Sequence, residues 1–193
     1  MEAGLKKILK NYGLLVLIVA VIIVLDQWTK SLVLKNIPLN QMWRPGEWPI
    51  SWFRFVFVQN TGVAFGMFKD QSTLFTILPF IVSALIIYYY VQIPNPDWAL
   101  RLALSMQLGG AIGNLIDRLT LGYVVDFVSV GTFPVFNVAD ACITVGVGIL
   151  LLDMFLEERR EKMKAALETA DEDEDEQADA APENISMDEA VSS

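Results

Sequence analysis

Four long apolar stretches, separated by shorter polar segments, dominate the hydrophobic pattern of this chain. They cover about residues 11–34, 73–93, 98–119 and 137–157. A helix needs about 20 apolar residues to cross the hydrocarbon core of a bilayer, and each stretch reaches that length. The pattern therefore predicts a membrane protein with an all-α core of four transmembrane helices, contained in residues 1–164.

The segment of about residues 40–68, between the first two apolar stretches, has a different pattern. Residues 50–58 are rich in β-branched and aromatic side chains, which is typical of a strand. Asn60-Thr61-Gly62 follows as a turn signal. Three tryptophans in the segment suit the membrane interface. We expect a small extracytoplasmic β-rich segment at the membrane surface.

Basic residues near the two termini indicate the orientation of the predicted helices. Lysines precede the first apolar stretch at positions 6, 7 and 10, and four lysines and arginines follow the last one between residues 159 and 164. Four spans place both termini on the same side, and an excess of basic residues marks the cytoplasmic side. A cleavable signal peptide is the alternative for the first stretch, but no small-residue cleavage site follows it.

The net charge of −9 belongs to the end of the chain. Residues 165–193 hold eleven acidic residues and no basic one, which leaves fourteen bases and twelve acids for residues 1–164. Such a segment buries too little apolar surface to fold, so we expect a disordered acidic cytoplasmic tail.

The absence of histidine and the single cysteine, Cys142, exclude several kinds of catalytic site. Neither a Ser-His-Asp triad nor a Cys-His pair is possible. Zinc sites built from histidines or several cysteines are excluded as well. Aspartates are then the most economical catalytic groups in the chain, and we expect neither a metal nor a cofactor.

The conspicuous polar residues of the apolar region all fall near one membrane face in the predicted topology. Ionisable groups at such depths are costly and usually functional. They comprise Asp26, Lys30, Asn114, Asp117, Arg118, Asp126, Asn137 and Asp140. Chance would scatter these residues over both faces, so the clustering predicts a single site.

Each group also has a structural interpretation. Asp26 and Lys30 have the i,i+4 spacing of a helix ion pair, and Asn137 with Asp140 has the spacing of a capping box. Asp117 could balance the charge of its neighbour Arg118. Gly109, Gly110 and Gly113 indicate a close helix-packing face rather than a phosphate-binding loop.

Asp126 is harder to explain in this way, because it lies in an apolar run with no neighbouring base. Its expected partner is Asp140, fourteen residues later and at the same predicted membrane depth. Two close carboxyl groups in a poorly solvated site share a proton. One can then activate water while the other protonates the carbonyl oxygen or the leaving amine, as in aspartic peptidases.

Five short motifs resemble those of a known family, in the family's order. They are Asp-Gln-x-x-Lys (26–30), Asn-x-Gly-x-Ala-Phe-Gly (60–66), Gly-Gly-x-x-Gly-Asn-x-x-Asp-Arg (109–118), Val-Val-Asp-Phe (124–127) and Phe-Asn-x-Ala-Asp (136–140). The family is the bacterial lipoprotein signal peptidase, signal peptidase II, and the resemblance covers about residues 13–156. Two features depart from it: residues 129–133 form a short stretch for the family, and the acidic tail is no part of its pattern.

The resemblance implies an aspartic endopeptidase of the bacterial inner membrane, with Asp126 and Asp140 as the catalytic pair. Its substrates would be prolipoproteins, cut just before a diacylglyceryl-modified cysteine near the outer face of the membrane. Residues expected to support the site or bind substrate are Asp26, Lys30, Asn60, Gly110, Asn114, Arg118, Asn137 and Ala139. We expect a monomer surrounded by membrane lipid, with no nucleic-acid partner.

Three other functions are compatible with parts of the sequence. A small membrane transporter or channel would use the carboxylates as an ion path, but would be expected to place polar residues at several depths. A serine–lysine peptidase would use Lys30, yet Ser51 and Ser129 have no motif context. A non-catalytic membrane scaffold is the third alternative.

Overall fold

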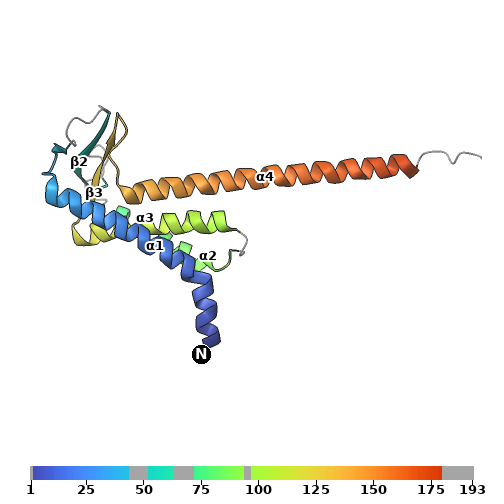
Figure 1. Ribbon diagram of the computed structural model, residues 1–193, viewed down its shortest axis with the longest axis horizontal. Coiled ribbons are helices and arrows are strands. Elements are labelled where there is room, and N and C mark those ends of the chain that lie inside the picture. The colour runs from blue at the N-terminus through green and yellow to red at the C-terminus, as the bar shows by residue number, and fades with distance from the viewer. Residues whose placement is uncertain (1, 44–51, 63–71, 94–96, 180–193) are drawn as a thin grey trace, which may run out of the picture. The chain divides into compact units, whose positions relative to one another are not determined.

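The computed structural model describes residues 2–43, 52–62, 72–93 and 97–179. Its elements follow in the order α1 (Glu2–Asn36), β1 (Met42–Trp43), β2 (Phe53–Asn60), α2 (Ser72–Tyr90), α3 (Trp98–Thr120), β3 (Val124–Val130) and α4 (Val138–Asp179) (Figure 1). The described part is mostly helical and contains a three-stranded sheet. The chain divides into two compact units, Met1–Leu151 and Leu152–Ser193, and α4 begins in the first and ends in the second.

Three helices in the described part are long and apolar enough to cross a membrane. They are Tyr12–Asn36 of α1, Trp98–Thr120, and Val138–Glu168 of α4. The apolar part of α2, Phe75–Tyr90, is shorter. At 1.5 Å per residue the 19 residues of α2 span about 28 Å, close to the roughly 30 Å of a hydrocarbon core. Because its apolar part is shorter than that of the other three helices, the crossing by α2 stays a prediction.

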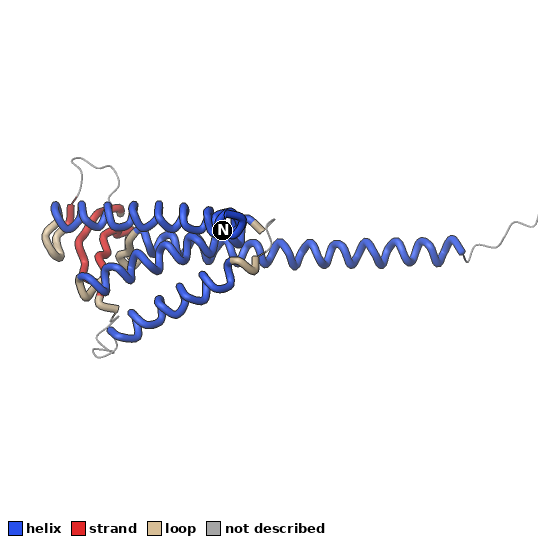
Figure 2. Tube along the Cα trace, turned by 90° about the horizontal axis from the view of Figure 1, so that it is seen from below, coloured by secondary structure: helices blue, strands red, loops and turns tan. Residues whose placement is uncertain are grey.

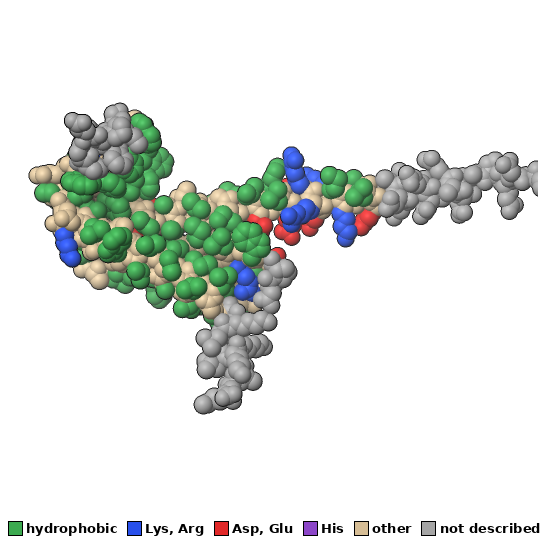
Figure 3. All heavy atoms as spheres, in the orientation of Figure 1, with side chains coloured by type: hydrophobic (Ala, Val, Ile, Leu, Met, Phe, Trp, Pro, Cys, Tyr) green, Lys and Arg blue, Asp and Glu red, His purple; other side chains and the backbone are tan. Residues whose placement is uncertain are grey.

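The outward side chains of these helices are apolar. Val16, Leu17 and Val24 of α1 are each more than 60% exposed, and hydrophobic side chains cover most of the visible face of the first unit (Figure 3). Exposed apolar surface of this extent is unfavourable in water but matches lipid chains. With the helix lengths, it identifies the chain as a membrane protein.

The sheet lies at one end of the helices of the first unit (Figure 2). Its strand order is β1-β2-β3 and both pairings are antiparallel, with Val58 opposite Asp126 and Asn60 opposite Val124. The expected strand at residues 50–58 is present as β2, displaced to Phe53–Asn60. Residues 44–51 and 63–71 of the expected β-rich segment lie outside the described residues.

The last strand, β3, was not predicted, because the sequence pattern placed Asp126 in a connection between two helices. Residues 123–130 read Tyr-Val-Val-Asp-Phe-Val-Ser-Val, and β-branched residues at this density favour a strand. All but two of the seven strand residues are buried, so the polar–apolar alternation of a half-exposed strand is missing.

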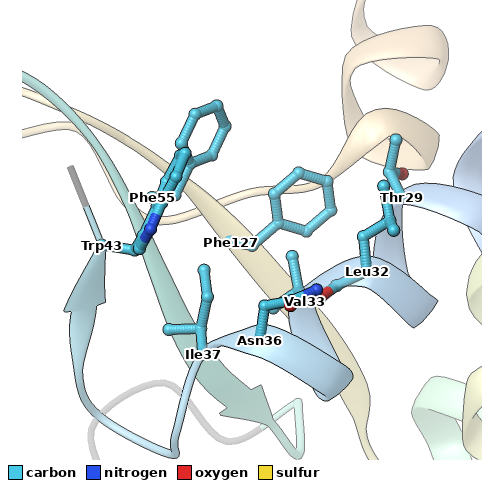
Figure 4. Close-up of a pocket in the computed structure, with 8 residues that line it drawn as sticks. All are labelled: Thr29, Leu32, Val33, Asn36, Ile37, Trp43, Phe55 and Phe127. Atoms are coloured by element: carbon cyan, nitrogen blue, oxygen red, sulfur yellow. Dashed lines mark hydrogen bonds between the residues drawn. The ribbon is translucent and has the colours of Figure 1, made fainter. Parts of the chain in front are cut away.

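Successive side chains of β3 point to opposite faces of the sheet. Val125 and Phe127 pack with Val33 and Ile37 at the end of α1. Beside this cluster lies a pocket of about 380 Å³, lined by Thr29, Leu32, Val33, Asn36, Ile37, Trp43, Phe55 and Phe127 (Figure 4). The carboxyl group of Asp126 points to the other face, away from this pocket.

The long helix α4 corrects one expectation. Residues 165–179 were predicted to be disordered with the rest of the acidic tail, but they continue α4 to Asp179, and residues 180–193 lie outside the described part. The helix is favoured by alanine, glutamate and leucine, which are strong helix formers. Ion pairs at i,i+4 spacing, Lys162–Glu158 at 2.6 Å and Lys164–Glu168 at 3.8 Å, precede the acidic run.

Candidate active site

The fold brings the ten site residues expected from the sequence to the end of the first unit where the sheet lies. They come from five elements: Asp26 and Lys30 from α1, Asn60 from β2, Gly110, Asn114 and Arg118 from α3, Asp126 from β3, and Ala139 and Asp140 from α4, with Asn137 just before that helix. Hydrogen bonds connect most of them into one network.

The carboxyl group of Asp126 is buried, with 2% of the residue exposed. The amide of Asn60 donates to its Oδ2 at 2.8 Å, and the amide of Asn137 donates to its Oδ1 at 2.8 Å. The backbone N–H of Gly62 fixes the Asn60 amide by donating to Oδ1 at 2.8 Å. Gly62 has φ +82°, a left-handed conformation that favours glycine. The turn expected at residues 60–62 therefore orients the Asn60 amide that donates to Asp126.

The second carboxyl group, that of Asp140, lies in the first turn of α4 and is half-buried. The expected capping box is present: Asp140 N–H donates to Asn137 Oδ1 at 2.9 Å, and Asn137 N–H donates to Asp140 Oδ2 at 3.3 Å. Asn114 Nδ2 also donates to Asp140 Oδ1 at 2.7 Å. The side chain of Asp140 therefore both takes part in the helix cap and joins the hydrogen-bond network through Asn114.

Two amides join the two carboxyl groups. Asn137 Nδ2 lies 3.1 Å from Asn114 Oδ1, while these same side chains bind Asp126 and Asp140 respectively. The network fixes the amide orientation of both asparagines, because each oxygen accepts and each nitrogen donates in a consistent direction.

Burial shifts the titration of Asp126. Burial and the charge of Asp140 raise the pKa of its carboxyl group, and Asn60, Asn137 and Lys30 oppose them; the net result is a pKa raised from 3.8 to about 6. A carboxyl group in this state can hold a proton near neutral pH, as a general acid must.

A buried ion cluster adjoins the two carboxyl groups through Asn114. Lys30 Nζ contacts Asp26 Oδ2 at 2.8 Å, Asp117 Oδ2 at 2.9 Å and Asn114 Oδ1 at 3.0 Å. An ammonium group has three donors, and each has a partner here. The i,i+4 ion pair expected from the sequence is present, but it belongs to this larger cluster.

Asp26 also reaches across to α4. The backbone N–H of Ala139 donates to Asp26 Oδ1 at 3.0 Å, so a side chain of α1 satisfies a free N–H in the first turn of α4. Close helix contacts accompany this bond: a Cβ on Gly110 would overlap the carbonyl oxygen of Ala139, and one on Gly113 would lie 2.7 Å from Asp26 Oδ2. These glycines pack helices together, as the sequence indicated.

Two further residues belong to the network: Gln27, which was not expected, and Asp117, which was expected in the polar cluster but was given no catalytic or supporting role. Gln27 Nε2 donates to Asp117 Oδ1 at 2.9 Å, and Asp117 Oδ2 accepts the N–H of Val125 at 3.0 Å. Asp117 does interact electrostatically with its neighbour Arg118, as interpreted from the sequence, but its hydrogen-bonded ion pair is with Lys30. Both residues stand within the motifs Asp-Gln-x-x-Lys and Asn-x-x-Asp-Arg, which was the available signal.

Arg118 is half-buried on the face of α3 that carries Asn114. Its guanidinium lies close enough to Asp140, Asp126 and Asp117 to interact electrostatically with all three. Arg118 thus places a positive charge near the carboxyl groups, although it forms no direct ion pair with them among the described residues.

Comparison with known proteins assigns the sequence to a family. The sequence profile described as Signal peptidase (SPase) II matches residues 18–156, which include every residue of the network. The chain belongs to the signal peptidase II family. Membership makes it a peptidase, and the matched segment ends within α4, before the acidic part of the chain.

Individual relatives of this signal peptidase II chain cover most of its length. A "Lipoprotein signal peptidase" of Halalkalibacterium halodurans is 42% identical over 152 residues, 76% of this chain and 94% of the relative. One of Caldanaerobacter subterraneus subsp. tengcongensis is 42% identical over 139 residues, 70% and 91% of the two chains. A solved structure described as a bacterial membrane enzyme superposes with a TM-score of 0.68 at 27% identity, covering 76% of this chain and 90% of that one.

Proposed function

We propose that this protein is a membrane-embedded aspartic endopeptidase that removes the signal peptide from lipid-modified prolipoproteins. It cuts just before the diacylglyceryl-cysteine, and Asp126 and Asp140 are its catalytic residues. The observation that carries the proposal is the joining of these two carboxyl groups through the Asn114 and Asn137 amides. The relatives' name, lipoprotein signal peptidase, supports the substrate class.

The chemistry assigns different tasks to the two carboxyl groups. Asp126 holds the shared proton, because burial raises its pKa to about 6. Asp140, the more accessible group, takes a proton from a water whose oxygen attacks the scissile carbonyl carbon, while Asp126 protonates the carbonyl oxygen. The C–N bond then breaks as Asp140 gives its proton to the leaving amine, and Asp126 recovers a proton as the new carboxyl group forms.

The other residues of the network support this reaction. Asn60 and Asn137 hold Asp126, Asn114 holds Asp140, and Asp26 holds the first turn of α4 through Ala139. Arg118 faces the carboxyl groups with a positive charge and is proposed to bind the substrate backbone near the carbonyl oxygen.

The surroundings suit a lipid-anchored substrate. A signal peptide is itself an apolar helix, so it can enter from the bilayer, and the acyl chains of the modified cysteine can stay in lipid. We propose four spans in the bacterial inner membrane, α2 included, with both termini in the cytoplasm and the site near the outer face. The enzyme acts as a monomer, without cofactor or nucleic acid.

The substrate class can be tested with two forms of one prolipoprotein, identical in sequence and differing only in the diacylglyceryl group on the cysteine. Purified enzyme is expected to cut the modified form alone, and mass spectrometry should show the new N-terminus at the modified cysteine. Equal cleavage of the unmodified form, or a cut elsewhere, would contradict the proposal.

A further inference from the structure

The two carboxyl groups sit on different elements, so something must fix the distance between β3 and the start of α4. We infer that Asp117 is a positioning residue, which works with Asp26 through Lys30 to align Asp126 with Asp140. The inference rests on the proposed function of the two aspartates and adds how their spacing is set.

The backbone before Asp126 and the backbone before Asp140 are held in the same way. Asp117 Oδ2 accepts the backbone N–H of Val125, the residue immediately before Asp126, at 3.0 Å. Asp26 Oδ1 accepts the backbone N–H of Ala139, the residue immediately before Asp140, at 3.0 Å. Each proposed catalytic residue therefore follows a backbone group that is held by a buried carboxylate.

One ammonium group, that of Lys30, joins the two carboxylates. Lys30 Nζ lies 2.8 Å from Asp26 and 2.9 Å from Asp117, and its third contact is Asn114, which donates to Asp140. Gln27 adds a bond to Asp117 at 2.9 Å. Lys30 thus connects, through its three partners, to the backbone before Asp126, to the backbone before Asp140 and to the Asp140 side chain.

The three charged groups of this cluster are all removed from solvent. Asp26 is fully buried, and Lys30 and Asp117 are each 2% exposed. Buried charges are costly, and apolar side chains of similar volume often hold helices together equally well or better. The hydrogen bonds of this cluster end at the backbone beside each proposed catalytic residue. We explain the buried charges by this alignment, because small displacements of reacting groups slow a reaction strongly.

The test uses Asp117→Asn, because Asn keeps the size and one acceptor oxygen but loses the charge and cannot serve Lys30, Gln27 and Val125 as Asp does. We expect kcat to fall about 10- to 100-fold, with KM within about threefold of wild type, since the substrate surface is unchanged. The pH profile of kcat should also move to lower pH. Without the negative charge of Asp117, the positive charge of Lys30 is less neutralised and favours the ionised form of Asp126 more strongly, which lowers the pKa of Asp126. The charges of Asp140, Arg118 and Asp26 are unchanged.

A matched control is Arg101→Gln, which removes another buried charge of α3. Arg101 lies at the far end of that helix, where it donates to the carbonyl of Ile93 at 2.7 Å and stacks over the Tyr90 ring. This variant should lose thermal stability but keep the wild-type kcat and pH profile.

Asp117→Asn with wild-type kcat and pH profile, whatever its Tm, would overturn the inference. If that variant does not fold, Asp117→Glu decides instead, because it keeps the charge and changes only the reach: a kcat loss of about tenfold or more supports alignment, and wild-type kcat contradicts it. Wild type and Asp126→Asn are assayed alongside. Failure of wild type to cleave, or cleavage by Asp126→Asn, would instead refute the proposed function.

Discussion

The amide nitrogen of Asn137 lies 2.8 Å from the carboxyl oxygen Oδ1 of Asp126, although Asn137 precedes a different element, α4. The same side chain accepts the N–H of Asp140 through Oδ1 at 2.9 Å. One amide therefore caps the helix that carries Asp140 and binds the carboxyl group of Asp126.

Substitution of Asn137 should separate these two roles. Asn137→Asp keeps the helix cap, since aspartate is an equally good N-cap, but it loses the donor to Asp126 and adds a third carboxyl group. We expect prolipoprotein cleavage to fall at least about 100-fold. The new carboxyl group is buried beside Asp126, so thermal stability should also fall, and fall most at high pH, where that group ionises. Asn137→Ala should lower cleavage, and its lost cap should lower stability at every pH. Wild-type cleavage by Asn137→Asp would show that the amide donor is not needed.

The raised pKa of Asp126 predicts a pH-dependent stability effect. Its folded pKa of about 6 exceeds the ordinary 3.8, so the folded state loses relative stability as pH rises from about 4 to about 6. At 1.36 kcal/mol per unit the ionised group costs up to about 3 kcal/mol above that window. Asp126→Asn removes this cost, so the Tm difference between variant and wild type should be larger at pH 7.5 than at pH 4. An equal difference at both pH values would contradict the shift.

Glycine 110 offers a test of the contact between α3 and α4. Gly110→Ala would place a methyl group against the carbonyl oxygen of Ala139, next to Asp140. We expect a destabilisation of about 1–3 kcal/mol, measured by thermal unfolding, together with slower cleavage. The matched control is Gly148→Ala in α4, where a Cβ meets nothing within 4 Å. If the two variants behave alike, the close approach is not what constrains residue 110.

The proposed topology predicts that both termini lie in the cytoplasm. A reporter fused after Lys164 should be active only in its cytoplasmic form, and a second reporter inserted between α2 and α3 should also report the cytoplasm if α2 crosses the membrane. An external position for the reporter after Lys164 would contradict the assignment of the site to the outer face. An external signal from the reporter between α2 and α3 would contradict the crossing by α2, and the three remaining spans would then place the two termini on opposite sides.

Truncation after Lys164 is expected to leave cleavage intact. The family match ends at residue 156, and every residue of the network lies before it. The measurement is prolipoprotein cleavage at matched enzyme concentration, and its loss in a folded truncated enzyme would assign a catalytic role to the acidic segment.

The apolar stretches allowed the helices to be predicted to within a few residues at most of their ends, because length and apolarity alone define a potential span. The start of α1 at Glu2 and the end of α4 at Asp179 were missed, since the helix continues beyond the apolar residues at both positions. Strand β3 was missed for the opposite reason: it is buried on both faces, so its pattern does not alternate.

Within the site, the residue types indicated a pair of carboxyl groups, but they could not reveal which side chains hold them in place. The bonds from Asp117 to Val125 and from Asp26 to Ala139 depend on the register of α1 against α3 and α4. That register is a product of packing at glycines 109, 110 and 113. A list of polar residues carries no information about it.

The most direct test of the account is cleavage of lipid-modified prolipoprotein by Asp126→Asn, Asp140→Asn and the double variant at equal enzyme concentration. Each single variant keeps the size and some hydrogen bonds of the wild-type side chain but cannot exchange a proton at neutral pH. We predict a loss of at least about 100-fold for each, and a double variant scarcely slower than either, because the two groups act as one unit. Near-normal turnover by either single variant would contradict the aspartic mechanism.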